Sequence, residues 1–398
     1  MVTVYSKALN THSTVSRIIG KIKGAQKGPV IIFFGGMHGN EPSGVFALEK
    51  VFKTLQADKI KGSVYAFAGN LSALSKNVRY LQKDLNRLWT KENLEKIKNI
   101  SSGSLTDDEK ELADLYSLIA NILEQETGPF YFIDLHTTSS KTLPFITLDD
   151  SLINRKFASL FPLPAVLGLE EYLTGPMLSY INELGYVAIG FESGQHEQKA
   201  AIDNAEAFTY LTLVNGGCMA KKNIPDFDNY YSKLKKSAKG NDFIFEVIDC
   251  YKIINRNQFK MLPGFKSFQE ISKGTGLARN NGTLIKSAKK GTLFMPLYQK
   301  KGGEGFFIIR KIPVFFLKLS TLLRNFKLDS LLTVLPGVSW TTPRKETLLV
   351  NLKVARFLTR PFFHLLGYRN RQLDKNHIKM NNRERTSKKQ MYRSQRWY

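Results

Sequence analysis

The chain has 398 residues, of which 42% are hydrophobic and 12% aromatic, and its formal net charge is +24 at pH 7. This balance supplies a large buried core and excludes a globally disordered chain. With only two cysteines, Cys218 and Cys250, and no C-x-x-C spacing, a disulfide framework is not expected, which fits a reducing cytoplasm. The opening residues lack the pattern of a secretory signal, and no apolar run reaches the length of about 18 residues that a membrane span needs.

The first half of the chain alternates apolar runs with helix-compatible segments, the pattern of an α/β domain. Several of the apolar runs end in glycine or in a polar residue that can bind a ligand. Because open α/β sheets place their sites beyond the carboxyl ends of the strands, these residues are expected to converge on one site. The predicted strands are 29–36 (PVIIFFGG), 62–68, 130–135 and 186–191, and the predicted helices are 42–55, 107–124 and 205–214.

The second half changes character near residue 225. A connector rich in Lys and Tyr, at 229–240, precedes short β-like runs separated by Gly, Asn and Pro. From residue 301 on, 21 Lys and Arg stand against 5 Asp and Glu, a net of +16 that leaves +8 for residues 1–300. Most of the basic excess is thus in an appended segment. The expected domains are a catalytic domain at 1–225, a small β domain covering the site at 226–307, a basic and apolar extension at 308–368, and a disordered basic tail at 369–398.

The motif Gly35-Gly36-Met37-His38-Gly39-Asn40-Glu41-Pro42 carries the strongest chemical signal. A His and a Glu three positions apart, on a loop between a strand and a helix, can both face one cation. His136, at the end of the next long apolar run, is the natural third ligand. Two imidazoles and a carboxylate suit a catalytic zinc with an open position, although neighbouring transition metals tolerate the same ligands.

Two carboxylates accompany this ligand set. Asp134 lies two residues before His136, so both face the same side of a strand; it either orients the imidazole or is a solvated strand-edge residue. Glu192, in Gly190-Phe191-Glu192-Ser193-Gly194, follows an apolar run and is suited to accept and return a proton; the alternative is a surface glutamate in a turn.

The segment Arg79-Tyr80-Leu81-Gln82-Lys83-Asp84-Leu85-Asn86-Arg87 adds two arginines and an asparagine. Arginine binds carboxylates through two parallel hydrogen bonds and can also stabilise a developing oxyanion. A charged surface loop has a similar composition, so this segment predicts substrate binding only in combination with the other motifs.

Together the motifs GGMHGNE, RYLQKDLNR, DLHTTSS, GFESGQ and MPLYQKKGGEGFF resemble, in the same order, those of the succinylglutamate desuccinylase/aspartoacylase family of zinc-carboxypeptidase-like hydrolases. The resemblance covers roughly residues 29–307. It implies a carboxypeptidase-like mixed sheet flanked by helices, followed by a small β domain. It also implies one zinc ion on His38, Glu41 and His136, with Glu192 as the base that activates water.

The same resemblance implies roles for the remaining candidates. Arg79 would steady the oxyanion, Asn86 and Arg87 would bind the α-carboxylate, and Tyr298 would close over the substrate from the β domain. One feature departs from the family. Aspartoacylases carry an arginine for the second carboxylate of the acyl group on the segment before the catalytic glutamate, and here residues 179–186 (SYINELGY) contain none. Since a buried carboxylate needs a cationic partner, the substrate is expected to be less acidic.

The leading hypothesis is therefore a cytoplasmic zinc-dependent amidohydrolase that cleaves small N-acyl amino acids. A close alternative is a carboxypeptidase-like hydrolase of a peptide or peptidoglycan fragment. A hypothesis of another class concerns the basic tail, in which Tyr392, Trp397 and Tyr398 are interleaved with Arg and Lys. Such a tail contacts nucleic acid or an anionic membrane surface, or is simply solvated. The apolar cluster at 312–335 either lies at a membrane interface or packs on the catalytic domain.

Overall fold

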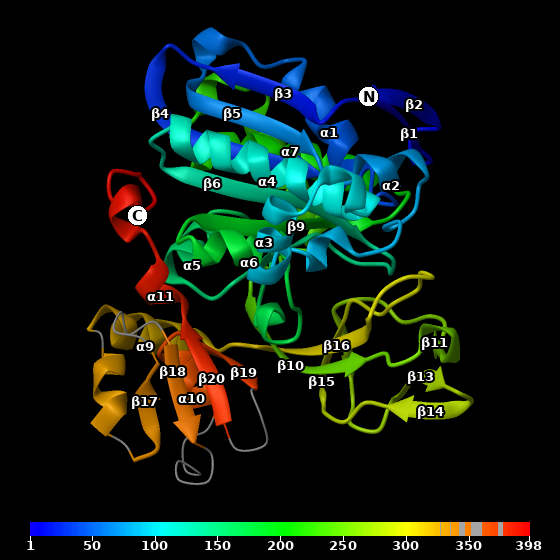
Figure 1. Cartoon of the computed structure of the whole chain (residues 1–398), viewed down its shortest axis with the longest axis vertical. Coiled ribbons are helices and arrows are strands. Elements are labelled where there is room, and N and C mark those ends of the chain that lie inside the picture. The colour runs from blue at the N-terminus through cyan, green and yellow to red at the C-terminus, as the bar shows by residue number, and fades with distance from the viewer. Residues whose placement is uncertain (327, 335, 342–346, 352–359, 373–376) are drawn as a thin grey trace.

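A computed structural model describes residues 1–398 except 327, 335, 342–346, 352–359 and 373–376. Its centre is a mixed sheet of eleven strands with helices on both faces (Figure 1), which confirms the predicted fold class. Most pairs in the middle of the sheet are parallel, one central pair is antiparallel, and antiparallel strands extend the sheet toward both edges. In spatial order the strands are β12 (Gln269–Ile271), β15 (Gly291–Phe294), β16 (Glu304–Lys311), β10 (Ile244–Lys252), β8 (Ala165–Leu167), β7 (Phe145–Leu148), β9 (Val187–Gln195), β6 (Phe130–Thr138), β4 (Gln26–Gly35), β5 (Lys61–Ala68) and β3 (Ile18–Lys23).

The central strands β4, β6 and β9 are the predicted apolar runs, and they pair in parallel. Both faces of these strands are covered, which explains why their sequences are continuously apolar rather than alternating. β6 and β9 run further than predicted, to Thr138 and Gln195, because they remain paired beyond their apolar portions. As a result His136 and Glu192 are directly opposite each other in the sheet, within strands rather than in the loops that follow.

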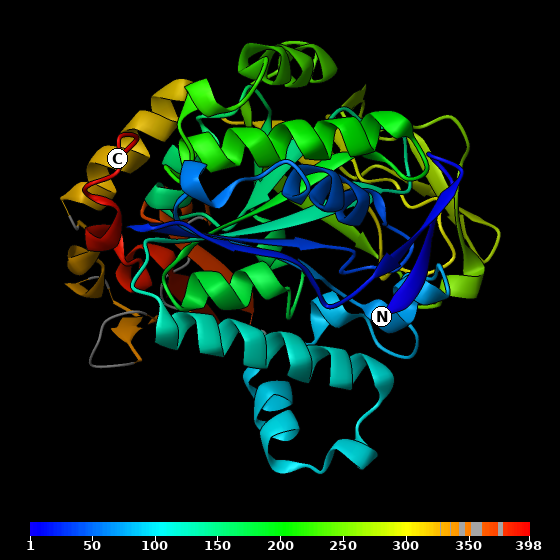
Figure 2. The same ribbon diagram turned by 90° about the horizontal axis from the view of Figure 1, so that it is seen from above.

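Helices cover the two faces of the sheet in two layers, as the view from above shows (Figure 2). The helix predicted at 107–124 is observed as α4, which begins with a capping box of Thr106 and Glu109. The predicted connector at 229–240 is instead mostly helical, because Leu234 is buried against the core. One face carries α1 (Ser43–Phe52), α5 (Leu152–Ala158), α7 (Lys199–Asn215) and α8 (Phe227–Ser237); the other carries α3 (Lys91–Asn99), α4 (Asp107–Gln125) and α6 (Met177–Glu183).

Small elements surround this sandwich. The strands of the predicted small β domain do not form one separate sheet, since β10, β12, β15 and β16 continue the main one and β11 (Phe259–Met261), β13 (Gly276–Asn280) and β14 (Thr283–Lys286) form a three-stranded sheet apart from it. The remaining elements here are β1 (Val2–Ser6), β2 (Thr11–Val15) and α2 (Leu71–Ser75). Short 3-10 helices occupy Ala57–Lys59, Leu85–Arg87, Ser102–Ser104, Leu169–Glu171, Lys221–Asn223, Arg256–Gln258, Leu328–Val334 and Lys389–Tyr392.

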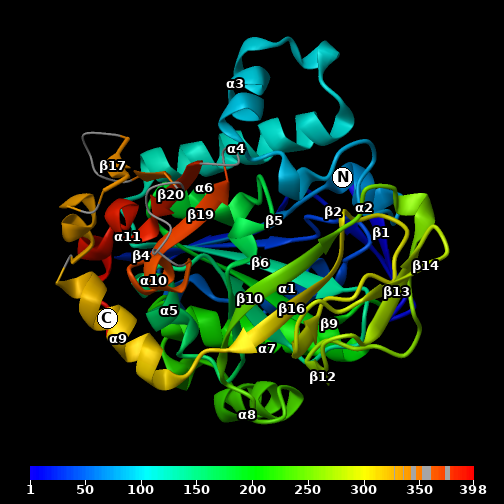
Figure 3. The same cartoon turned by 90° about the horizontal axis from the view of Figure 1, so that it is seen from below.

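The C-terminal extension is a four-stranded antiparallel sheet with its own small core. Strands β10 and β16 run between this sheet, at the lower left of Figure 1, and the three-stranded sheet, at the lower right; Figure 3 gives a second view. Its elements are α9 (Val314–Asn325), β17 (Val338–Trp340), β18 (Thr347–Asn351), α10 (Arg360–Leu365), β19 (Tyr368–Gln372), β20 (His377–Asn382) and α11 (Arg383–Thr386).

The prediction of a disordered tail from residue 369 is wrong for the residues that the structure describes. Strands β19 and β20 complete the C-terminal sheet, and the chain then returns to the catalytic domain. Tyr392 is fully buried there: its hydroxyl donates to the Phe130 carbonyl at 2.5 Å and accepts from the Val187 amide at 2.9 Å. Trp397 packs on Phe157. The aromatic residues that suggested nucleic-acid or membrane contact thus serve packing, and that contact stays a prediction.

Helix α9 has an unusual distribution of side chains. Ser320 and Arg324 are buried, whereas Phe315 on the same helix and Phe326, directly after its end, are 68% and 69% exposed. In the described part of the chain no helix has the length and apolar character required to cross a bilayer. The interfacial position proposed for residues 312–335 remains a prediction.

Candidate active site

His38, Glu41 and His136 meet in a buried site at the end of the central strands. Their candidate ligand atoms all lie within 4.8 Å of one another. Glu41 bridges the two imidazoles, with Oε1 2.9 Å from Nδ1 of His38 and Oε2 3.0 Å from Nδ1 of His136. The Thr137 amide also donates to Glu41 Oε2, at 3.0 Å. The structure therefore brings together the three residues that the sequence selects as metal ligands.

The loop that presents His38 and Glu41 depends on its glycines. Gly36 has φ +75°, a conformation that L side chains rarely adopt, and a Cβ on Gly39 would lie 2.1 Å from the carbonyl carbon of Ala73. Only glycine fits at both positions. Glu41 then directly precedes α1, so the loop and the helix start fix its carboxylate beneath the strand end.

Each imidazole is also held from its outer side by a carboxylate. Nε2 of His38 lies 3.1 Å from Asp84 Oδ1, and Nε2 of His136 lies 2.7 Å from Asp134 Oδ2. A carboxylate on the outer nitrogen fixes the orientation of a ligating imidazole and increases its basicity. The sequence predicts this orienting role for Asp134 as one of two alternatives. It assigns no role to Asp84, although Asp84 lies within the Arg79–Arg87 segment.

Mutual attraction between these groups dominates the electrostatics. Burial by itself would raise the pKa of Glu41, but the two imidazoles hold it well below its usual range. Burial would lower the pKa of His136, yet Asp134 and Glu41 hold it well above the usual value. The pKa of Asp84 is likewise low despite burial, because of His38 and Arg79. The carboxylates of Glu41 and Asp84 therefore stay ionised at neutral pH, as a ligand and an orienting group of a cation must.

Glu192 occupies the neighbouring strand, opposite His136. Its side chain is buried, and Oε2 has no hydrogen-bond partner among the described residues. Burial, reinforced by the charges of Glu41 and Asp134, raises its pKa to about 8 against the opposing effect of His136 and Arg79. A carboxyl group with a pKa near neutrality is suited to accept a proton and then release it.

The Arg79–Arg87 segment reaches the same cavity. Arg79 lies 3.5 Å from Glu41 Oε1 and 3.2 Å from Asp84 Oδ2. Asn86 approaches Nε2 of His136 at 3.4 Å, and its side-chain oxygen accepts from the Met177 amide at 2.9 Å. Arg87 lies 3.3 Å from Glu304 Oε2. All three predicted substrate-contacting residues of this segment thus line the cavity.

Tyr298 does not line the cavity in this structure, and the prediction that it closes over the substrate stays a prediction. Its hydroxyl donates to the Leu262 carbonyl at 2.7 Å and accepts from the Phe265 amide at 3.1 Å. The side chain thereby faces a different depression in the surface. Its neighbours Leu297 and Gln299 line the active-site cavity in its place. The motif located the segment correctly but not the direction of its side chains.

The cavity has a volume of about 140 Å³ and a second group of polar residues, which sequence reasoning missed. Asp149 follows β7, Glu170 lies in the 3-10 helix Leu169–Glu171, and Ser179 lies in α6. None belongs to a recognisable motif; only the folded chain brings them to the cavity that contains the metal-ligand set.

Fold and site together define an α/β protein with a His-Glu-His metal-ligand set and a buried glutamate at the carboxyl edge of its sheet. Residues 27–212 match the family described as "Succinylglutamate desuccinylase/Aspartoacylase catalytic domain". That segment of this chain is similar to the family's catalytic domain, and it contains all the candidate ligands. The remaining residues lie outside the match.

Known proteins of this family are also similar to this chain. Aspartoacylase of Xenopus tropicalis is 27% identical over 235 residues, 56% of this chain and 68% of its own length. Aspartoacylase of Rattus norvegicus is 26% identical over 236 residues, 57% and 69% of the respective chains. Among solved structures, a succinylglutamate desuccinylase/aspartoacylase from Rhodobacter sphaeroides has a TM-score of 0.55 at 15% identity, covering 73% of this chain and 88% of its own. The product-bound ectoine utilization protein EutE (DoeB) from Ruegeria pomeroyi gives 0.54 at 18%, covering 73% and 87%. These two structures establish likeness of fold.

Proposed function

We propose that this protein is a zinc-dependent hydrolase that cleaves the amide bond of a small N-acyl amino acid. The observation that carries the proposal is the position of Glu192 in the sheet register opposite His136, beside the buried His38–Glu41–His136 set. A metal-ligand set next to a buried, unpartnered carboxyl group is the arrangement that hydrolysis of an unreactive amide requires.

The residues fit zinc by their chemistry. Two imidazole nitrogens and one carboxylate are the donors of catalytic zinc sites, and both imidazoles are held on their outer sides by Asp84 and Asp134. When bound, zinc supplies a Lewis acid that polarises a carbonyl and acidifies water.

Other residues of the cavity transfer the proton, stabilise the oxyanion and bind the substrate carboxylate. Glu192 accepts the proton of the attacking water and returns it to the leaving nitrogen, as its raised pKa favours. Arg79 donates to the oxygen of the scissile carbonyl as negative charge develops there. Asn86 and Arg87 bind the carboxylate of the amino acid.

The experiment that tests the proposal is removal and return of the metal during amide hydrolysis. Purified protein is expected to contain about one zinc per chain. Dialysis against a chelator should abolish hydrolysis of N-acyl amino acids, and stoichiometric zinc should restore it. Full activity in the metal-free protein would reject the proposal.

The carboxypeptidase-like alternative is tested in the same assay. The cavity volume of about 140 Å³ favours a small substrate over a peptide, since drug-sized ligands occupy about 300–1,000 Å³. We expect N-acyl amino acids to be cleaved faster than short peptides or peptidoglycan fragments. Faster cleavage of the peptides or peptidoglycan fragments would instead support the carboxypeptidase-like function.

A further inference from the structure

We propose that the substrate of this site carries a positively charged nitrogen, an ammonium or guanidinium group, which binds to Asp149 and Glu170. This inference rests on the proposed function and narrows its substrate class. It is based on one part of the cavity that contains the metal-ligand set, where Asp149 and Glu170 both contribute to the lining and are almost closed to solvent. The side chain of Glu170 is only 2% exposed and that of Asp149 is 9% exposed.

The hydrogen bonds of these two carboxylates are incomplete. Oε1 of Glu170 accepts from the Asp150 amide at 3.3 Å, but Oε2 has no donor among the described residues. Oδ1 of Asp149 accepts from the Ser179 hydroxyl at 3.2 Å, while Oδ2 has an ion-pair distance of 3.4 Å to Arg383 and no hydrogen bond. Burying a carboxylate oxygen without a hydrogen-bond donor costs free energy. A ligand that brings a donor to Glu170 or Asp149 would remove that cost.

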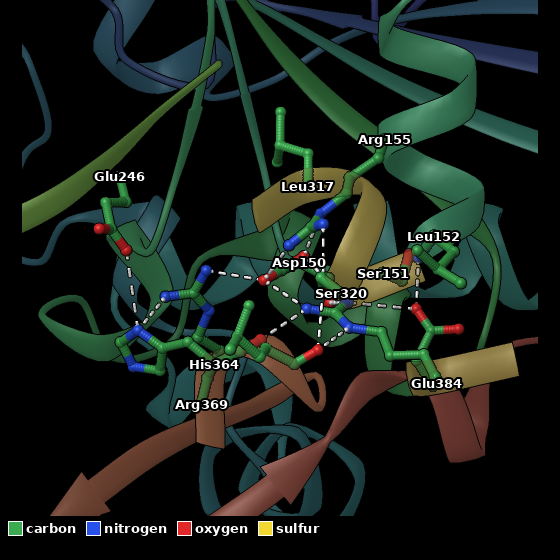
Figure 4. A network of polar contacts seen from close by, with 12 residues as sticks. Asp150, Ser151, Leu152, Arg155, Glu246, Leu317, Ser320, His364, Arg369 and Glu384 are labelled. Carbon is green, nitrogen blue, oxygen red and sulfur yellow. Dashed lines mark hydrogen bonds and ion pairs between the residues drawn. The ribbon is translucent and has the colours of Figure 1, made fainter. Parts of the chain in front are cut away.

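Of the two nearby arginines, Arg369 is mainly engaged by other acids, whereas Arg383 is shared between Asp149 and a second acid. Arg369 lies 3.7 Å from Glu170 but 2.7 Å from Asp150 and 2.9 Å from Glu171. The Asp150 side of this network is drawn in Figure 4, where Arg369 approaches Asp150 from the C-terminal extension. Arg383 divides its charge between Asp149 and Glu183. Neither Arg369 nor Arg383 lines the cavity, so the residues that a substrate meets here are acidic and have no cation beside them among the described residues of the cavity wall.

The cations that do line the cavity belong to its other part. Arg79 is paired with Asp84 and Glu41, and Arg87 is paired with Glu304. Burial raises the pKa of Asp149 and, together with the charge of Asp149, raises that of Glu170 to about 8. A bound cation would remove this repulsion and stabilise both ionised carboxylates, whereas a substrate carboxylate would increase it.

The sheet register places the acidic wall away from the scissile bond. Phe145 of β7 pairs with Glu192, and Leu148, three residues further, pairs with Ile189. Asp149 therefore lies four residues along the strand from the level of Glu192. The cationic group is accordingly on one arm of the substrate, not at the reacting carbonyl.

The test compares substrates that differ in one terminal group. For the acyl arm, β-alanyl, succinyl and butyryl derivatives of one amino acid supply a cation, an anion and a neutral group on chains of similar length. For the amino-acid arm, Nα-acetyl derivatives of ornithine, glutamate and norleucine do the same. The cationic member of one series should have the highest kcat/KM, by about 10- to 100-fold over the neutral member, as expected for a hydrogen-bonded charged group. Equal or better cleavage of the neutral or acidic members in both series would overturn the inference while leaving the proposed function intact.

Substitutions of Glu170 and Asp149 test whether these two residues cause the preference for a cationic substrate. Glu170→Gln should reduce the ratio of cationic to neutral kcat/KM to near unity, and Asp149→Asn serves as a second variant if the first does not fold. Glu171→Gln is the matched control: Glu171 is adjacent, also buried and paired with Arg369, but does not line the cavity. A loss of the ratio in the control equal to that in Glu170→Gln would contradict a direct contact.

Binding gives a readout that does not depend on turnover. Calorimetry of the same panel on the Glu192→Gln variant should rank the cationic compounds first, even if no compound is hydrolysed by the wild-type protein. Absence of hydrolysis with this ranking retained would reject only the proposed function. Absence of the ranking would reject the cation site.

Discussion

At the scale of single residues, the site consists of charges that hold one another in place. Each candidate ligand imidazole lies between Glu41 and a second carboxylate, Asp84 for His38 and Asp134 for His136. The ligands were predictable because His38, Glu41 and His136 lie at the ends of apolar runs. Asp84 was not assigned a role, because nothing in a linear motif indicates which side chain turns toward an imidazole.

These outer carboxylates are expected to tune metal affinity. Asp84→Asn and Asp134→Asn each remove the charge from the outer nitrogen of one imidazole, and each should weaken zinc binding by about 10- to 100-fold. Competition with a chromophoric chelator measures the change. Asp107→Asn, at an exposed carboxylate in the first turn of α4, is the control that should leave affinity as it is. Unaltered zinc affinity in both site variants would show that the two carboxylates do not support the metal.

Glu109 offers a residue-scale prediction for stability. Burial by itself would raise its pKa, but Lys83, Lys96 and Thr106 lower it to about 2. A carboxyl group with a depressed pKa in the folded state stabilises the protein above its unfolded pKa of about 4.3, and this contribution is lost as the pH falls toward 2. Glu109→Gln should therefore melt at a lower temperature than the wild type at pH 7. That difference should shrink between about pH 4.3 and 2, as thermal unfolding across this range would show, and a constant difference would contradict the assignment.

At the scale of elements, the C-terminal extension is anchored to the catalytic domain by a buried ionic cluster (Figure 4). Asp150, directly before α5, is fully buried and lies 2.6 Å from Arg155, 3.0 Å from Arg324 of α9 and 2.7 Å from Arg369 of β19. The basic excess of the last quarter, which suggested an external anionic partner, is therefore partly used inside the molecule. Composition alone does not reveal this, because it depends on acids that lie 174 to 219 residues earlier in the chain.

Breaking this cluster should be severe. Asp150→Asn leaves the guanidinium groups of Arg324 and Arg369 buried without their shared counter-charge, which typically costs about 3–5 kcal/mol. Asp228→Asn, at an exposed ion pair with Lys221, is the matched control and should cost less than about 1 kcal/mol. Denaturant unfolding of both variants measures the difference. Comparable small losses would mean that the cluster does not hold the extension.

At the scale of the whole molecule, the sequence predicted the α/β class, the central strands and the metal-ligand set, since continuous apolar runs and polar strand ends are local signals. It did not predict the ordered tail. Residues 383–398 are polar and basic on average, yet Tyr392 finds a fully buried site between β6 and β9 that only the assembled sheet creates. The orientation of Tyr298 and the acidic wall of Asp149 and Glu170 also depend on tertiary contacts.

In the proposed mechanism, Glu192 transfers the proton beside the His38–Glu41–His136 metal-ligand set. The sharpest test of this mechanism is one preparation of Glu192→Gln, measured for zinc content and for hydrolysis of the preferred N-acyl amino acid alongside the wild type. Since Glu192 is not a ligand in this assignment, the variant should retain about one zinc per chain and lose about 10²- to 10⁴-fold in kcat. A variant that keeps its zinc and the wild-type rate would contradict the central claim.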